Sequence, residues 1–157
     1  MFFEKRMAAH AIELLKPTIG EMLDVHNKEG LHIVIIAGKR PDDTQNEEVS
    51  YPVVYDDCLR HPVQQCRHLA MGKARVSWRT SAPSDIISSR YPELIQKGDS
   101  LYTGGIAESV DNFCVAVGVS GLKDYHDEAL AKSILAFIKA EMIAKARLIM
   151  EDDGLAK

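Results

Sequence analysis

The sequence has few cysteines, no long apolar run and no excess of positive charge, and each absence narrows the possible classes of protein. Its three cysteines, Cys58, Cys66 and Cys114, are an odd number without a CxxC pair, which predicts free thiols in a reducing compartment. No apolar run is long enough to cross a bilayer, so we expect no membrane-spanning segment. The opening residues, MFFEKRMAAH, lack the apolar core of a signal peptide, and we expect a cytoplasmic protein.

Several functional motifs are also missing. A formal net charge of -4 argues against general nucleic-acid binding, which favours strongly basic surfaces. The chain contains neither a phosphate-binding loop of the form Gly-x-x-x-x-Gly-Lys-[Ser/Thr] nor a dinucleotide fingerprint. No nucleophile and base stand at a recognisable spacing. No repeat, low-complexity tract or linker divides the chain, so we predict a single domain over residues 1–157.

The N-terminal part of the chain predicts a helix followed by a buried strand. Apolar residues recur at helical spacing at Ile12, Leu15, Ile19, Met22 and Leu23. Pro17 should kink this helix or split it in two, because proline removes a backbone donor and clashes with the preceding turn. Gly30 is a suitable helix stop, and the β-branched run LHIVIIAG after it predicts a buried strand.

The middle of the chain predicts a loop, a strand and several helices. The polar segment KRPDDTQNEE predicts an exposed loop. The run VSYPVVY predicts a strand, and its Pro52 places that strand at a sheet edge or a bulge. A helix is expected over HPVQQCRHLAMGKARVSWRT, with Pro62 in its first turn. Ser84 and Pro92 mark the start or break of one or two short helices.

The C-terminal part predicts a hairpin and a long helix. The runs GGIAESV and FCVAVGVSG predict two strands joined by a tight turn at Asp111 and Asn112. The amphipathic helix that follows should have Asp124 as its N-cap and Asp127 in its first turn. Its buried stripe is expected to comprise Leu130, Ile134, Phe137 or Ile138, and Met142.

The C-terminal motifs resemble those of the GlcG/HbpS family, also called the haem-degrading-domain family, which includes the C-terminal domain of PduO-type cobalamin adenosyltransferases. The shared features are a double glycine, a short hairpin, a Gly-Val-Ser-Gly and an Asp-Glu at the start of the last helix. They correspond here to Gly104, Gly105, Ile106, Gly118, Val119, Ser120, Gly121, Asp127 and Glu128. Upstream, Lys73-Ala74 and the segment SWRTSAPS match the family's helical Lys-Ala and the Ser or Thr that follows it.

One departure concerns the segment before the Lys-Ala helix. Many members carry Arg-x-Asp-Gly-Ala there, whereas this chain has DDCLRHPVQQ. A shorter UPF-type branch also lacks that motif and has a Ser-Gly-Leu like Ser120-Gly121-Leu122, so the haem properties of other relatives transfer less directly. The resemblance implies an α/β (α+β) fold with a profilin-like antiparallel sheet flanked by helices, a long C-terminal helix and assembly into symmetric oligomers.

The resemblance and the residue types together select a ligand-binding set. It comprises Lys73, Arg79, Gly104, Gly105, Ser120 and Asp127. Lys73 and Arg79 would hold a carboxylate or a propionate, and the paired glycines would let a ligand approach backbone N–H groups. The alternative is a solvated basic face for the two cations and close packing for the glycines. We place the pocket where Gly104-Gly105, the Ser120-Gly121 turn and the C-terminal half of the Lys73 helix approach each other.

Four soft ligands gather in the segment CLRHPVQQCRH, namely Cys58, His61, Cys66 and His68. Their spacing matches no common zinc pattern, and Cys66 and His68 on one helix would point roughly 200° apart. We therefore predict no metal site, a buried Cys66 and surface histidines. His61 and His68 are still candidates for an axial haem ligand.

These observations favour a small-ligand-binding protein, with haem or a related tetrapyrrole as a possible cofactor. One alternative is an enzyme that acts on a small organic acid, in which Lys73 and Arg79 hold the carboxylate and His126 or Asp127 handles protons. Another is a non-catalytic interaction module. In each case we expect a homo-oligomer, because the apolar strands and the last helix offer more nonpolar surface than one sheet layer needs.

Overall fold

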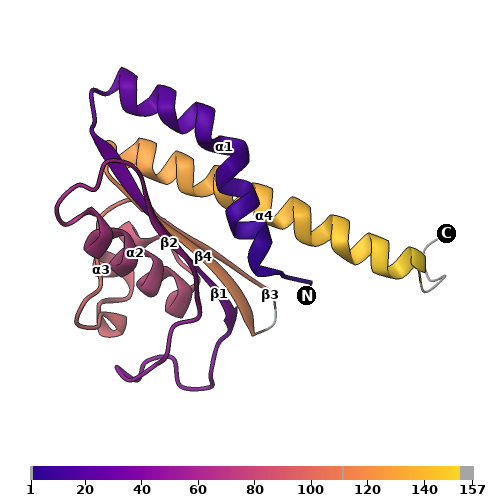
Figure 1. The fold of residues 1–157 in the computed structure, drawn as a ribbon. Coiled ribbons are helices and arrows are strands. Elements are labelled where there is room, and N and C mark those ends of the chain that lie inside the picture. Colours follow the sequence, from indigo (N-terminus) through magenta and orange to yellow (C-terminus); the bar gives the residue numbers. More distant parts are fainter. Residues whose placement is uncertain (1, 111, 153–157) are drawn as a thin grey trace.

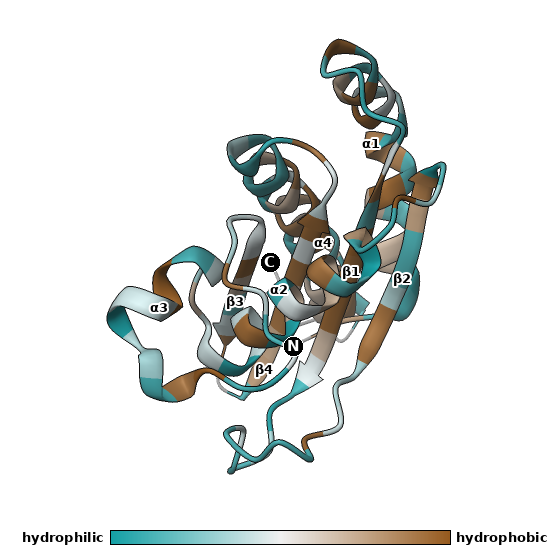
Figure 2. Ribbon diagram, turned by 90° about the vertical axis from the view of Figure 1, so that its left-hand side faces the viewer, coloured by the Kyte–Doolittle hydropathy of each residue, from teal (hydrophilic) through white to brown (hydrophobic). Residues whose placement is uncertain are grey.

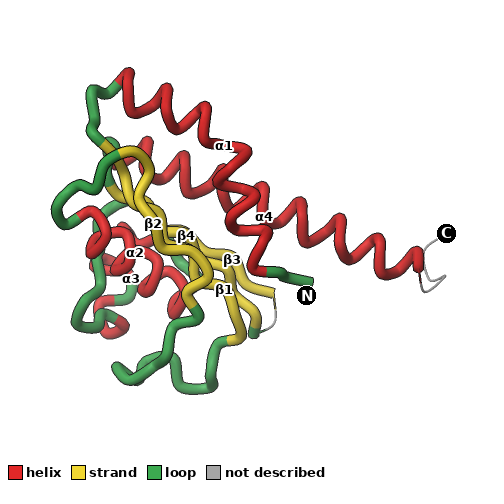
Figure 3. The backbone as a smooth tube through the Cα atoms, in the orientation of Figure 1, coloured by secondary structure: helices red, strands yellow, loops and turns green. Residues whose placement is uncertain are grey.

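The structure, a computed structural model that describes residues 2–110 and 112–152, contains one four-stranded antiparallel sheet. Its strands are β1 (Gly30–Lys39), β2 (Val53–Arg60), β3 (Gly105–Val110) and β4 (Phe113–Ser120), in the spatial order β2-β1-β4-β3. The long helices are α1 (Lys5–Val25), α2 (Cys66–Thr80) and α4 (Asp124–Asp152). Three short helices, η1 (Ser84–Ile86), α3 (Ile87–Arg90) and η2 (Pro92–Leu94), follow α2 (Figure 3).

Helices cover both faces of the sheet, with α1 and α4 on one side and α2 on the other (Figure 1). Ile33 and Ile35 of β1 pack in the core beneath α1 and α4, whereas Val34 and Ile36 pack with Trp78 of α2. Successive strand residues point to opposite faces, so a strand covered on both faces is apolar throughout. This explains the continuous run LHIVIIAG and confirms the predicted antiparallel sheet flanked by helices.

The edge strand β2 differs in composition from the two central strands. Figure 2 shows β1 and β4 as largely apolar, whereas β2 contains hydrophilic segments. Pro52 immediately precedes β2, and the register shifts between Ile35 and Ile36, so the prediction of an edge or a bulge is confirmed. The strand begins at Val53 rather than at Val49, and it continues to Arg60, beyond the predicted end. An edge strand with a solvated face accommodates the polar side chains of this later part.

The first helix and its end differ from the prediction. α1 is one continuous helix that contains Pro17, so the alternative that this proline splits it is wrong; the helix changes direction near its middle (Figure 1). Gly30 is not the helix stop. α1 ends at Val25, Asn27 has a left-handed φ of 52°, and Gly30 already belongs to β1.

The start of α2 was also predicted too early. The helix begins at Cys66, so Pro62 does not lie in its first turn. Gln65, immediately before the helix, has a φ of 69°, and this left-handed conformation prevents the helix from extending toward Pro62. The short helices begin at Ser84 and Pro92, as predicted.

The C-terminal hairpin and helix agree well with the sequence. β3 and β4 pair antiparallel, although Asp111 of the predicted turn lies outside the described residues. Asp124 is the first helical residue of α4 rather than its N-cap, and the Lys123 carbonyl accepts the N–H of Asp127. The buried stripe includes Ile138, while Phe137 is exposed. Within residues 2–110 and 112–152, no helix is both long and apolar enough to cross a membrane.

Candidate functional site

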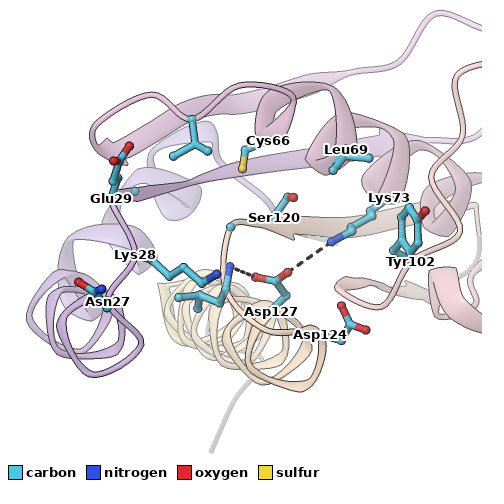
Figure 4. Close-up of a pocket in the computed structure, with 14 residues that line it drawn as sticks. Asn27, Lys28, Glu29, Cys66, Leu69, Lys73, Tyr102, Ser120, Asp124 and Asp127 are labelled. Carbon is cyan, nitrogen blue, oxygen red and sulfur yellow. Dashed lines mark hydrogen bonds and ion pairs between the residues drawn. The ribbon is translucent and has the colours of Figure 1, made fainter.

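A pocket of about 440 Å³ lies where the α1–β1 loop, α2, the end of β4 and the start of α4 meet. The pairing of β1 with β4 creates this site, because it places His32 opposite Ser120 and so brings the start of β1 beside the end of β4. The volume lies within the roughly 300–1,000 Å³ typical of small-molecule sites. The labelled lining residues are Asn27, Lys28, Glu29, Cys66, Leu69, Lys73, Tyr102, Ser120, Asp124 and Asp127 (Figure 4).

A buried ion pair forms part of the pocket wall. The Lys73 ammonium lies 3.4 Å from Asp127 Oδ2 and donates a hydrogen bond of 2.8 Å to the Val119 carbonyl. Asp127 Oδ1 accepts the backbone N–H of Leu122 at 2.9 Å (Figure 4). Through its two oxygens, this carboxylate therefore connects the start of α4 to the loop before it and to Lys73 of α2. Only 3% of the Lys73 side chain and 4% of the Asp127 side chain are exposed.

Burial shifts these two groups in opposite directions. It lowers the pKa of Lys73, although the nearby Asp127 carboxylate opposes this shift. It raises the pKa of Asp127, although Lys73 and the Leu122 N–H favour the charged form. The two pKa values therefore lie closer together than those of free side chains, and less free energy is needed to move a proton between the two groups.

The paired glycines support Lys73 from behind the pocket and are not among its lining residues. Gly104 has a φ of 127°, and a Cβ there would lie 2.6 Å from the Val119 carbonyl oxygen and 3.0 Å from Lys73 Nζ. At Gly105 a Cβ would lie 2.6 Å from the Lys73 carbonyl oxygen. Both glycines are thus required for close packing, which was the alternative to direct ligand contact.

The position of the pocket along α2 corrects another expectation. The pocket contacts Cys66, Leu69 and Lys73, which belong to the N-terminal half of the helix and its middle, rather than to the C-terminal half. Ser84, which the sequence analysis identified only as a helix start, donates to the Tyr102 carbonyl at 2.5 Å and accepts the Gly105 N–H at 3.0 Å. It connects η1 to the segment before β3.

Arg79 lies away from this pocket in an enclosed ion pair. Its guanidinium donates to both carboxylate oxygens of Asp99, at 2.8 and 2.5 Å, and also to the Tyr51 hydroxyl and the Leu94 carbonyl. Burial alone would lower the pKa of Arg79, but the hydrogen bonds and charge of Asp99 raise it overall. Because Arg79 and Lys73 are both buried, the alternative of a solvated basic face is wrong.

The soft ligands are spread over β2, the loop that follows it, and α2. Cys58 lies in β2, His61 follows that strand, and Cys66 and His68 lie in α2. Cys66 is buried with its sulfur directed toward the pocket, while both histidines are exposed, as predicted (Figure 4). His68 lines a separate depression of about 420 Å³ that shares Leu69 and Tyr102 with the pocket. In the part of the chain that the structure describes, no three His, Cys, Asp or Glu residues are arranged to hold a metal.

Several pocket residues had no signal in the sequence. Asn27, Lys28 and Glu29 belong to a segment that pattern analysis identified only as the end of a helix. They reach the site through the long-range pairing of β1 with β4, which no local motif records. His126, the other predicted proton-handling residue, does not line the pocket; its ring lies 4.2 Å from that of His26, measured between centroids.

Comparison with known proteins supports the fold. No family model matches the sequence, and no curated protein matches it either. Among solved structures, HbpS is 15% identical over 87% of this chain and 89% of its own, with a TM-score of 0.58. The ORFY protein of Klebsiella pneumoniae is 17% identical over 83% and 89% of the two chains, with a TM-score of 0.56.

A third structure with this fold is that of PduOC in complex with haem. It is 17% identical and matches 82% of this chain and 91% of its own, with a TM-score of 0.52. These are structures of the GlcG/HbpS type, so the resemblance seen in the sequence motifs is confirmed at the level of the fold.

Proposed function

We propose that this chain binds a small molecule in the pocket beside Lys73 and Asp127, with haem or a related tetrapyrrole as the first ligand to test. The observation that carries the proposal is the buried Lys73–Asp127 pair in the wall of a pocket of about 440 Å³. Charged groups whose pKa values are shifted by burial beside a cavity are common at functional sites. The haem complex of PduOC, a protein of similar fold, supports the choice of ligand.

The residues of the pocket fit haem in chemical type. Lys73 and Lys28 would pair with acidic groups such as propionates, and Leu69 supplies an apolar contact. Cys66 and Tyr102 carry the thiol and the phenol that can ligate haem iron, whereas His61 and His68 do not line the pocket. When bound, haem would supply redox and ligand-binding chemistry at its iron, and the chain would supply orientation and charge.

A haem titration followed by absorbance tests this proposal. We expect a Soret shift that saturates at one haem per chain and weakens in Lys73→Met. Cys66→Ser and Tyr102→Phe identify the iron ligand, with His61→Ala as the matched control outside the pocket. A shift that weakens only in a His61 or His68 variant would place the haem outside this pocket, and a flat titration would eliminate haem.

A second candidate is an enzyme that acts on a small organic acid, and the opposed pKa shifts of Lys73 and Asp127 favour it. In this case Lys73 meets the carboxylate and Asp127 exchanges the proton, because Arg79 and His126 do not line the pocket. An acid that raises the melting temperature of the wild type but not of Lys73→Met would support this function.

A further inference from the structure

We infer that Lys73 is a carbonyl-reactive amine and that the pocket takes a small aldehyde or 2-oxo acid, which Lys73 binds as an imine. The inference rests on the proposed ligand pocket and names the class of compound that would occupy it. It requires an amine that faces a cavity, a neighbouring group that accepts and returns a proton, and space for the carbonyl carbon to approach the nitrogen.

The geometry around Lys73 meets these requirements. Its Nζ has the Val119 carbonyl at 2.8 Å and Asp127 Oδ2 at 3.4 Å, and the side chain lines the pocket. Gly104 packs against Nζ from behind the pocket, where a Cβ would lie 3.0 Å from the nitrogen, so a carbonyl carbon would approach from the cavity of about 440 Å³ that Lys73 lines. Among residues 2–110 and 112–152, Lys73 is the one lysine that is buried; Lys132 and Lys139 are typical of the exposed lysines.

The proposed reaction balances without any further reactant. The Lys73 ammonium passes a proton to the Asp127 carboxylate, and the free amine attacks the carbonyl carbon to form a C–N bond. The carbonyl oxygen takes up the proton from Asp127 and leaves as water with a second proton from the nitrogen. The product is a protonated imine that retains the positive charge beside Asp127. Burial, which lowers the pKa of Lys73 and raises that of Asp127, favours the first step.

A second cation favours a 2-oxo acid over a simple aldehyde. Lys28 extends from the α1–β1 loop into the same pocket toward Asp127 (Figure 4). A carboxylate next to the reacting carbonyl would pair with Lys28 while the carbonyl carbon meets Lys73. Aldehydes that lack a carboxylate would form the same imine but would lose this contact.

Reductive trapping tests the inference. The full chain is incubated with glyoxylate or, separately, with propionaldehyde in the presence of cyanoborohydride, and the modified lysines are mapped by peptide mass spectrometry. We expect Lys73 to be labelled faster than the exposed Lys132, and Asp127→Asn to slow labelling of Lys73 about tenfold or more. Lys28→Gln should slow labelling by glyoxylate but not by propionaldehyde. Lys123→Arg, an exposed substitution, is the matched control.

The decisive measurement uses the wild-type chain, so it does not depend on whether a variant folds. The inference would be overturned if exposed lysines are labelled while the peptide that contains Lys73 remains unmodified. If haem or an organic acid binds in parallel titrations while Lys73 is unlabelled, the pocket proposal stands and only the imine fails. If Lys73 is labelled and no haem binds, the carbonyl class stands and haem is eliminated. If Lys73 is not labelled and neither haem nor an organic acid binds, the imine inference and the pocket proposal both fail.

Discussion

Two buried ion pairs hold helix α2, and their geometries indicate different roles. Arg79 and Asp99 form two short hydrogen bonds, and 2% and 0% of their side chains are exposed. Lys73 meets a single oxygen of Asp127 at 3.4 Å beside a pocket. The first pair has its hydrogen-bonding groups engaged within the protein, which favours a structural role, whereas the second faces space that a ligand can enter.

Removing one partner of the enclosed pair should destabilise the protein. We expect Asp99→Ala to lower the free energy of unfolding by about 3–5 kcal/mol, because it leaves the Arg79 guanidinium buried without its counter-charge. Urea denaturation measures the change. Arg6→Ala, which breaks the exposed pair of Arg6 and Glu4, is the control and should have little effect. Equal losses for the two variants would contradict the structural role of Asp99.

The packing of Gly105 gives a second prediction. Gly105→Ala should lower the free energy of unfolding by about 1–3 kcal/mol, because its Cβ would lie 2.6 Å from the Lys73 carbonyl oxygen and 2.9 Å from Ser77 Oγ. Gly20→Ala in α1 is the matched control: the nearest atom to its Cβ would be 3.5 Å away, so we expect it to stabilise the helix by about 0.5–1 kcal/mol. Thermal or urea unfolding of both variants compares them, and a neutral Gly105→Ala would show that the backbone there can shift.

At the scale of the elements, the end of α1 meets the start of α4 through two histidines. The rings of His26 and His126 lie 4.2 Å apart between centroids, and His126 Nδ1 is buried without a hydrogen-bond partner among the described residues. Burial lowers the pKa of His26, and the charges of His126, Lys123 and Lys28 lower it further. Protonation at this contact therefore opposes the packing of the two helices that border the pocket.

This contact predicts a pH dependence. Because the pKa of His26 is lower in the folded state, the unfolded chain binds more protons between that value and the ordinary value of about 6.5, so stability rises with pH across this window. Urea midpoints measured from about pH 5 to 8 should fall toward low pH. His26→Gln should flatten this slope relative to the wild type, and the exposed His68→Gln should leave it unchanged. Identical slopes in all three proteins would contradict the prediction.

At the scale of the whole molecule, local patterns predicted the elements but not the assembly of the site. The apolar run before Lys39 and the period of α4 identify buried surfaces that persist in the fold. The pocket instead joins Lys28, Lys73 and Asp127, which lie far apart in the sequence and meet through the pairing of β1 with β4. Family resemblance selected Lys73 and Asp127 but could not show Asp99, whose role depends on three-dimensional contact with Arg79.

The C-terminal turns of α4 extend beyond the sheet (Figure 1). They carry exposed apolar side chains. Ile143, Leu148 and Met150 are 51%, 57% and 43% exposed. An apolar groove of about 200 Å³ lies alongside, between α4 and strands β3 and β4, and Ile143 also lines it. Ile143 and Met150 are seven residues apart in α4 and therefore lie on the same side of the helix, next to the groove that Ile143 lines. A two-fold axis would bury these side chains and the groove together in a second copy.

We therefore expect the chain to form a homo-oligomer through this part of α4. Light scattering at micromolar concentration should give at least twice the monomer mass of 17.4 kDa. The double variant Ile143→Glu, Met150→Glu should be monomeric, because an interface would bury two unpaired carboxylates in each subunit, and its helix content by circular dichroism should be unchanged. Lys132→Gln, on the exposed surface of the same helix, should leave the mass unchanged. A monomeric wild type would show that these apolar turns tolerate solvent without a partner copy.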